Sequence, residues 1–144
     1  MTIRKWAALA AVTLSVMPFL AKANIPAGKC WLVAVGVEDY ILPSVPDLQF
    51  ANGDAKLLTQ AFVDVAKIPP AQTFLMTSDS IIEDNLPRTT NIAYRLGWLK
   101  DKCKPEDTVV FYFAGHGANI EGESFLMTEE ADNRSVGTLQ ASSL

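Results

Sequence analysis

The sequence is short of the residues that most metal and phosphate sites require. Its 144 residues include one histidine, His116, and two cysteines, Cys30 and Cys103, which are far apart in the chain. Zinc sites take three or four ligands of these types, so the composition does not predict a metal centre. Neither of the common glycine-rich spacings that cradle phosphate groups occurs. We therefore expect no metal and no cofactor.

Long apolar runs are scarce as well, and the one that opens the chain is shorter than a membrane span. Residues 1–5 are basic, residues 6–20 are mostly apolar, and residues 21–23 read Ala-Lys-Ala. A basic start, an apolar core and a small-x-small end are typical of a secretory signal peptide, whereas a membrane helix needs about 20 apolar residues. We therefore expect residues 1–23 to be a signal peptide and the protein to be periplasmic or secreted. An uncleaved membrane anchor is the alternative.

Basic residues are outnumbered by acidic ones. Lys and Arg number 12 and Asp and Glu 16, which gives a formal charge of −4. Removal of the leader would take Arg4, Lys5 and Lys22 with it and move the charge to about −7. An acidic surface argues against nucleic acid as a partner. We expect residues 24–144, which contain no internal repeat, to form a single domain without a stable membrane span.

One stretch, residues 108–117, organises the rest of the chain: Thr-Val-Val-Phe-Tyr-Phe-Ala-Gly-His-Gly. Its β-branched and aromatic residues do not alternate with polar ones, which is typical of a strand buried on both faces of a parallel sheet. The run ends on His116, between Gly115 and Gly117. Catalytic groups gather at the carboxyl ends of strands in open α/β sheets, and glycines let a substrate backbone approach closely. We therefore expect a catalytic histidine rather than a core one.

The remaining patterns alternate between strands and helices. Residues 30–37 and 73–77 are short apolar runs typical of strands, whereas residues 48–65 and 89–102 carry apolar residues at helical spacing. With the strand before His116, the order is strand, helix, strand, helix, strand. This order predicts an α/β fold with a mostly parallel sheet and right-handed helical crossovers.

Beyond His116 we expect a polar hairpin-like loop at residues 119–123, a further strand at 124–128 and the start of another element at 139–144. No capping glycine or polar tail follows. An open sheet that stopped here would be left without its remaining strands. We therefore expect the sequence to be the N-terminal part of a longer chain.

Neither cysteine is expected to be a nucleophile for His116. Cys103 lies just before the strand that leads to His116, and at about 3.3 Å per strand residue the two are roughly 20 Å apart. Cys30 begins its own strand, so in a parallel sheet it lies at the same far end. The two cysteines then lie near each other, and a disulfide between them is one prediction for an exported protein. Buried, reduced thiols are the alternative.

Four segments of the sequence resemble the signature segments of a known protein family. They are residues 32–40, 48–55, 107–117 and 123–126. The most specific combination is Phe-Tyr-Phe-Ala-Gly-His-Gly at the end of the third segment with Asn-Gly-Asp-Ala at the end of the second. Together they resemble the caspase-like peptidase domain in its bacterial metacaspase or orthocaspase branch. The resemblance implies a three-layer sandwich, a mostly parallel sheet with helices on both faces, incomplete at its C-terminus. It also implies a cysteine-type endopeptidase that cleaves peptides or proteins.

The resemblance also implies roles for individual residues. In that family a histidine at this place pairs with a cysteine at the end of the next core strand, so His116 would be the base of the dyad. The backbone N–H of Gly117 would help to form the oxyanion hole. Asp54 would contribute to a pocket for basic side chains, or interact with the dipole of the helix it begins. Asp39 would either close its loop by a hydrogen bond or take part in specificity.

The nucleophile is where the chain departs from the family. In caspases the cysteine lies about 50 residues beyond the histidine, whereas the sequence ends 28 residues after His116. We expect truncation before the catalytic cysteine and an inactive chain, since a dyad acts as a unit. The alternative is a non-catalytic caspase-like interaction module. A serine hydrolase using Ser124 is disfavoured because no Gly-x-Ser-x-Gly elbow exists. The sequence does not predict an oligomeric state.

Overall fold

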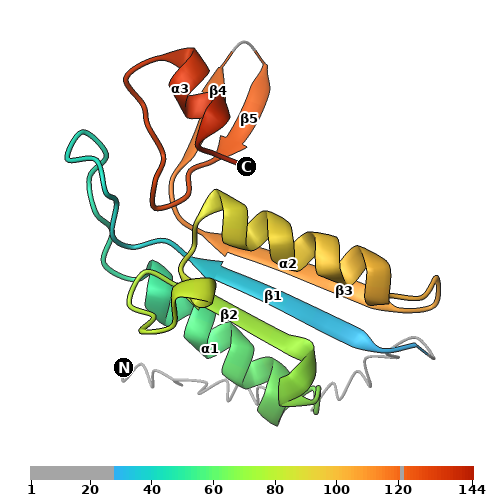
Figure 1. Ribbon diagram of the computed structural model, residues 1–144. Coiled ribbons are helices and arrows are strands. Elements are labelled where there is room, and N and C mark those ends of the chain that lie inside the picture. Colours follow the sequence, from blue (N-terminus) through green and yellow to red (C-terminus); the bar gives the residue numbers. More distant parts are fainter. Residues whose placement is uncertain (1–27, 121) are drawn as a thin grey trace, which may run out of the picture.

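The computed structural model describes residues 28–120 and 122–144 (Figure 1). The signal peptide predicted for residues 1–23 lies outside the described residues. In chain order the elements are β1 (Cys30–Gly36), α1 (Ala51–Asp64), β2 (Thr73–Thr77), α2 (Thr89–Lys102), β3 (Thr108–Ala114), β4 (Gly117–Ile120), β5 (Glu123–Leu126) and α3 (Val136–Ala141), with 3-10 turns at Pro70–Gln72 and Glu83–Asn85. No helix in these ranges is long and apolar enough to cross a membrane.

The main sheet has three parallel strands in the order β2-β1-β3. Leu32 of β1 is in register with Thr73 of β2 on one side and with Val110 of β3 on the other. With a neighbour on each side and a helix over each face, β1 is buried from Trp31 to Gly36. This burial explains why its sequence is an unbroken apolar run.

Successive side chains of β1 point to opposite faces of the sheet. On one face Trp31, Val33 and Val35 pack in a cluster with Ile92 and Leu99 of α2. On the other face a smaller cluster packs against α1; it comprises Leu32, Ala34, Ala55, Leu58 and Phe62 among others. The layers are therefore helix, sheet, helix (Figure 1). This confirms the predicted α/β sandwich with a parallel sheet and helices on both faces.

The start of α1 is set by the loop before it. Sequence spacing predicted a helix from residue 48, but α1 begins at Ala51. The main-chain N–H of Leu48 instead donates to the carbonyl of Glu38 (2.8 Å) and closes the loop. The Glu38 carboxylate accepts the N–H of Asn52 (3.1 Å) in the first turn of α1. A carboxylate at a helix N-terminus accepts a hydrogen bond from an otherwise unpaired N–H and interacts favourably with the positive end of the helix dipole.

The segment after His116 differs from the prediction. Residues 117–120 form strand β4, which pairs antiparallel with β5 in a second, two-stranded sheet. The sequence had indicated a polar loop at residues 119–123, because four residues with weak alternation carry little strand signal. Helix α3 begins at Val136, ahead of the predicted position, since Ser135 and Thr138 form a capping box.

Strand β3 is less buried than its composition predicted. In the described sheet it is an edge strand, and its outer side has no partner there. The side chains of Val109 and Phe111 are 43% and 37% exposed. Burial on both faces, predicted from the same apolar signature as in β1, therefore holds for β1 and not for β3.

The predicted disulfide between Cys30 and Cys103 is absent from the structure, where both thiols are free. Strand alternation supplies the reason. Cys30 precedes Trp31 and belongs to the face of β1 that packs on α1, whereas Cys103 packs with the cluster on the α2 face. The two side chains therefore belong to opposite faces of the sheet. Partial burial raises the pKa of both thiols above the ordinary value, so both stay protonated near neutral pH.

Candidate functional site

His116 lies two residues beyond the end of β3. Strands β1 and β3 end at the same end of the sheet (Figure 1). The N–H of Val37 donates to the carbonyl of Ala114 (2.8 Å) and extends the β1–β3 pairing to this edge. The histidine is only partly buried. It therefore stands at the carboxyl edge of the parallel strands and outside the two core clusters.

The imidazole is held by the loop that follows β1. Its Nε2 atom lies 2.8 Å from the carbonyl oxygen of Pro46, and its ring centroid lies 5.1 Å from that of Tyr40. A carbonyl oxygen can only accept a hydrogen bond, so Nε2 is the nitrogen that carries the proton. In neutral His116 the lone pair is then on Nδ1, which is free to accept a proton from another group.

The N–H of Gly117 points away from the β4–β5 hairpin. The N–H of Met127 donates to the carbonyl of His116 (2.9 Å), on the β5 side. In a trans peptide the N–H of Gly117 points opposite to that carbonyl. Leu126, which faces Gly117 in the ladder, exchanges both of its main-chain bonds with Leu144 (2.9 and 3.0 Å). Gly117 thus presents a main-chain donor next to the histidine.

Ser78, after β2, holds the beginning of the β1 loop. Its Oγ accepts the main-chain N–H groups of Glu38 (3.0 Å) and Asp39 (3.3 Å). Its own N–H donates to Oδ1 of the buried Asn52 in α1 (3.1 Å). The ends of β1 and β2 and the start of α1 are therefore tied together at one point.

A shallow depression of about 360 Å³ lies beside this loop. Its lining residues are Asp39, Tyr40, Ile41, Ser78, Leu86, Arg88 and Glu129. Tyr40 lines the depression, and its ring also packs against the imidazole of His116, so the depression and the histidine are adjacent. Substrate pockets are typically concave sites of this size with a few polar groups.

Arg88 and Glu129, which both line the depression, form an ion pair. Arg88 Nε donates to Oε1 of Glu129 (2.6 Å), whose side chain is 8% exposed, and Arg88 also pairs with Glu83. The hydrogen bond to Glu129 raises the pKa of Arg88 above its ordinary value. The carbonyl of Glu129 accepts the N–H of Ile41 (2.8 Å). Sequence reasoning missed this pair, since 41 residues separate its members and neither belongs to a recognisable motif.

The two predicted aspartates differ in their surroundings. Asp39 lines the depression, and within the described residues its carboxylate makes no hydrogen bond or ion pair. The loop is instead closed by Glu38 and by Asp47, whose carboxylate accepts the N–H of Tyr40 (2.9 Å). Asp54 is exposed in the first turn of α1, outside the depression. The structure thus places Asp39, but not Asp54, in the depression that Tyr40 also lines.

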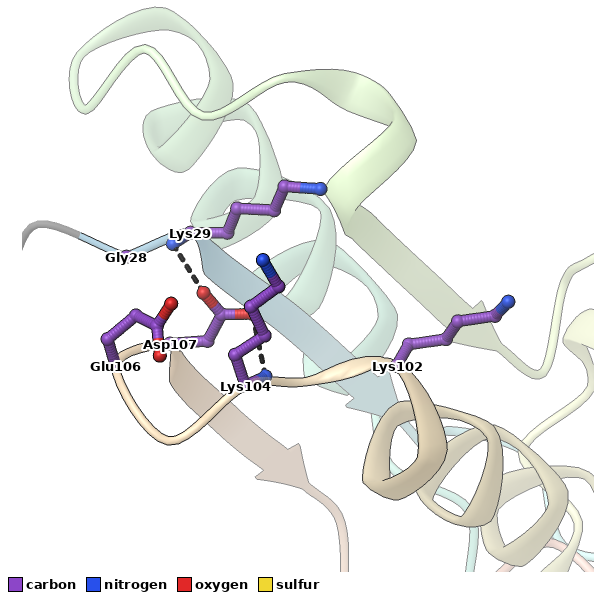
Figure 2. Close-up of a pocket in the computed structure, with 6 residues that line it drawn as sticks. All are labelled: Gly28, Lys29, Lys102, Lys104, Glu106 and Asp107. Atoms are coloured by element: carbon purple, nitrogen blue, oxygen red, sulfur yellow. Dashed lines mark hydrogen bonds between the residues drawn. The ribbon is translucent and has the colours of Figure 1, made fainter.

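A second hollow, of about 280 Å³, lies at the other end of the strands, where β1 and β3 begin (Figure 2). Lys29, Lys102 and Lys104 surround it, together with Gly28, Glu106 and Asp107. Asp107 acts structurally: its carboxylate accepts the N–H groups of Lys29 (2.7 Å) and Lys104 (3.1 Å) and the indole N–H of Trp31 (3.4 Å). It thereby fixes the chain before β1 to the turn before β3.

Acid is expected to weaken this anchor. The hydrogen bonds from Lys104 and Lys29 hold the pKa of Asp107 below its usual value. A carboxyl whose pKa is lowered by folding stabilises the protein above its unfolded pKa, and that stability is lost as pH falls through the folded value. Urea unfolding should therefore show a larger loss of stability between about pH 5 and pH 3 for the wild type than for Asp107→Asn. Equal losses would contradict this role.

A family model described as "Metacaspase, peptidase C14 domain" matches residues 29–138. The match includes β1, both long helices, His116 and the depression beside it, and extends into α3. It supports the resemblance found in the sequence.

Curated metacaspases from plants and yeast are similar to part of the chain. Metacaspase-2 of Arabidopsis thaliana is 29% identical over 73 residues, which cover 51% of this chain and 18% of that protein. Metacaspase-1 of the same plant is 26% identical over 72 residues, 50% of the chain and 20% of that protein. Metacaspase-1 of Yarrowia lipolytica is 29% identical over 73 residues, 49% and 16% respectively. The chain therefore spans about a fifth of the length of these relatives.

Proposed function

Because the chain belongs to the metacaspase family, the peptidase C14 domain, we propose that it is the histidine-bearing part of an exported cysteine endopeptidase. His116 acts as the general base, and a cysteine outside these 144 residues supplies the nucleophile. The substrates are peptides or proteins. Export is proposed on the composition of residues 1–23, and N-terminal sequencing of protein recovered from the periplasm or the medium tests it.

The hydrogen bond between His116 Nε2 and the Pro46 carbonyl (2.8 Å) supports the proposal most strongly. It fixes the ring at the carboxyl edge of the sheet and leaves Nδ1 as the basic atom. A thiol placed near Nδ1 would lose its proton to it, and the imidazolium formed would stabilise the thiolate. The Pro46 carbonyl would hold the imidazolium in the same orientation by accepting from Nε2 throughout.

The reaction follows from these groups. The thiolate attacks the carbonyl carbon of the peptide bond, and the negative charge moves to the carbonyl oxygen, where the N–H of Gly117 is one donor. The tetrahedral intermediate collapses, the C–N bond breaks, and the leaving amine takes the proton from His116. Water then hydrolyses the thioester, giving a carboxylic acid and restoring the thiol.

The depression beside His116 is the proposed binding site for the substrate chain. It offers the exposed carboxylate of Asp39, which has no partner among the described residues, next to the neutralised pair of Arg88 and Glu129. Asp39 is therefore proposed as an acceptor for a donor group of the substrate. Asp54, exposed in the first turn of α1, is proposed as a second, more distant acidic contact.

A non-catalytic interaction module is the second candidate. The positions of Cys30 and Cys103 support it, because neither cysteine can act as a nucleophile for His116. Both lie at the opposite end of the sheet from His116, and both thiols have a raised pKa. A longer chain without a third cysteine would retain the fold and the depression but not the chemistry.

Hydrolysis of short fluorogenic peptides by the product of the complete coding sequence tests the proposal. We expect cleavage that iodoacetamide abolishes, and a Cys30→Ser/Cys103→Ser double variant that cleaves like the wild type. A product that lacks a further cysteine, or turnover that survives alkylation, would contradict the peptidase and, in the first case, favour the interaction module.

A further inference from the structure

Tyr40, in the loop after β1, reaches across to the turn after β3. Its hydroxyl oxygen accepts the main-chain N–H of His116 (2.8 Å), and its ring packs at 5.1 Å from the imidazole. The side chain is only 8% exposed and belongs to the core cluster on the α2 face. Its own N–H donates to Asp47 (2.9 Å), which fixes the tyrosine backbone as well.

We propose that Tyr40 is the positioning residue for the catalytic histidine, and that its hydroxyl acts by locking the main chain of His116. The inference rests on the proposed role of His116 as a base. Tyr40 itself touches neither the scissile bond nor the nucleophile in this mechanism.

Both peptide groups that flank His116 are held from outside the turn. Tyr40 Oη binds the N–H on one side, and the N–H of Met127 binds the carbonyl on the other (2.9 Å). Since peptide groups are planar, these two bonds fix the backbone from which the imidazole projects. They also fix the direction of the Gly117 N–H, which shares a peptide group with the His116 carbonyl.

The neighbouring glycine fits this arrangement. A Cβ at residue 115 would lie 3.2 Å from Tyr40 Oη and 2.8 Å from Cε1 of Phe113. Any other residue there would press on the tyrosine hydroxyl, so Gly115 leaves room for the hydrogen bond. Burial raises the pKa of Tyr40, which keeps its hydroxyl protonated and neutral.

Tyr40→Phe removes only the oxygen and keeps the ring in the core. The N–H of His116 would then lose its acceptor, and an amide left unpaired in a partly buried turn opens more often. We expect hydrogen exchange of the His116 amide in the 144-residue chain to become roughly tenfold faster, while amides in the middle of β1 and β3 keep their rates. We also expect the ¹⁵N shifts of the imidazole to show a loss of the Nε2-protonated tautomer that the Pro46 contact selects.

Tyr94→Phe is the matched control, because it makes the same chemical change at a tyrosine that is 71% exposed on α2. It should leave both the His116 amide and the tautomer unchanged. Circular dichroism of the two variants separates a local effect from unfolding. Wild-type exchange and an unchanged tautomer in Tyr40→Phe would overturn the proposal.

A kinetic measurement on the complete peptidase distinguishes this inference from the proposed function. Tyr40→Phe should lower kcat about tenfold, because the base is less well oriented, and should change KM little, because the ring that lines the depression is retained. If His116→Ala abolishes cleavage but Tyr40→Phe keeps the wild-type kcat, the positioning role is wrong and the proposed function stands. If His116→Ala retains cleavage, the proposed function itself is wrong.

Discussion

Replacing His116 with alanine is expected to abolish peptide cleavage by the complete peptidase. Without the imidazole, the proposed mechanism has no base to accept the thiol proton and no acid to return it to the leaving amine. Members of a catalytic dyad act as a unit, so kcat/KM should fall on the order of 10⁴-fold or more. Initial rates on a fluorogenic peptide, with the enzyme concentration fixed by active-site titration of the wild type, measure this loss.

The fold should survive that substitution. The bonds that hold the turn use main-chain atoms of residue 116, its N–H to Tyr40 and its carbonyl to Met127, and alanine keeps both. Thermal unfolding should therefore change little. Asn119→Ala, an exposed position in β4, is the control and should cleave like the wild type. Turnover retained by His116→Ala would show that another group is the base.

Replacing Gly36 with alanine is expected to cause the largest loss of stability. A Cβ at this position would lie 2.5 Å from the carbonyl oxygen of Ala51 and 2.9 Å from Cα of Asn52. All of these atoms belong to the backbone at the start of α1, and the strand is paired on both sides, with Thr77 and Ala114. Neither strand β1 nor the start of α1 can shift without a large cost in energy, so we expect a loss of about 3 kcal/mol in the free energy of unfolding.

Gly53 supplies the matched control within the same chain. It lies in α1, and a Cβ there would meet nothing within 4 Å. Gly53→Ala should be neutral or stabilise the protein by up to about 1 kcal/mol, because alanine favours the helix. Urea denaturation of the two variants gives the comparison. Equal stabilities would show that the close approach of β1 to α1 does not limit this fold.

Loss of Gly36 would also disturb the candidate site. Asn52 accepts the N–H of Ser78 and donates its own N–H to Glu38, and Ser78 holds the N–H of Asp39. Pushing α1 away from the strand would release these contacts and the loop that carries Tyr40 and Pro46. The close packing of one glycine therefore supports the orientation of the histidine at the end of the neighbouring strand.

Local sequence signals predicted most of the described elements. The bounds of β2 and α2 agree with the predicted residues, and β1 differs by one residue, because apolar runs and helical spacing are properties of neighbouring residues. Strand β4 was missed because its four residues become a strand only by pairing with β5. The exposure of Val109 and Phe111 was missed for a related reason, since an apolar run does not reveal whether its strand lies at an edge.

The sequence by itself determined the order of strands and helices up to His116, the family signature and the position of His116 just beyond an apolar strand. Only the tertiary structure decided which atoms hold that histidine, the Pro46 carbonyl on Nε2 and the Tyr40 hydroxyl on its N–H. It also brought Arg88 and Glu129 together in the depression that Tyr40 lines. It also placed the two cysteines on opposite faces of the sheet. These contacts join residues 41 to 76 positions apart, and strand pairing, which no local pattern records, brings them together.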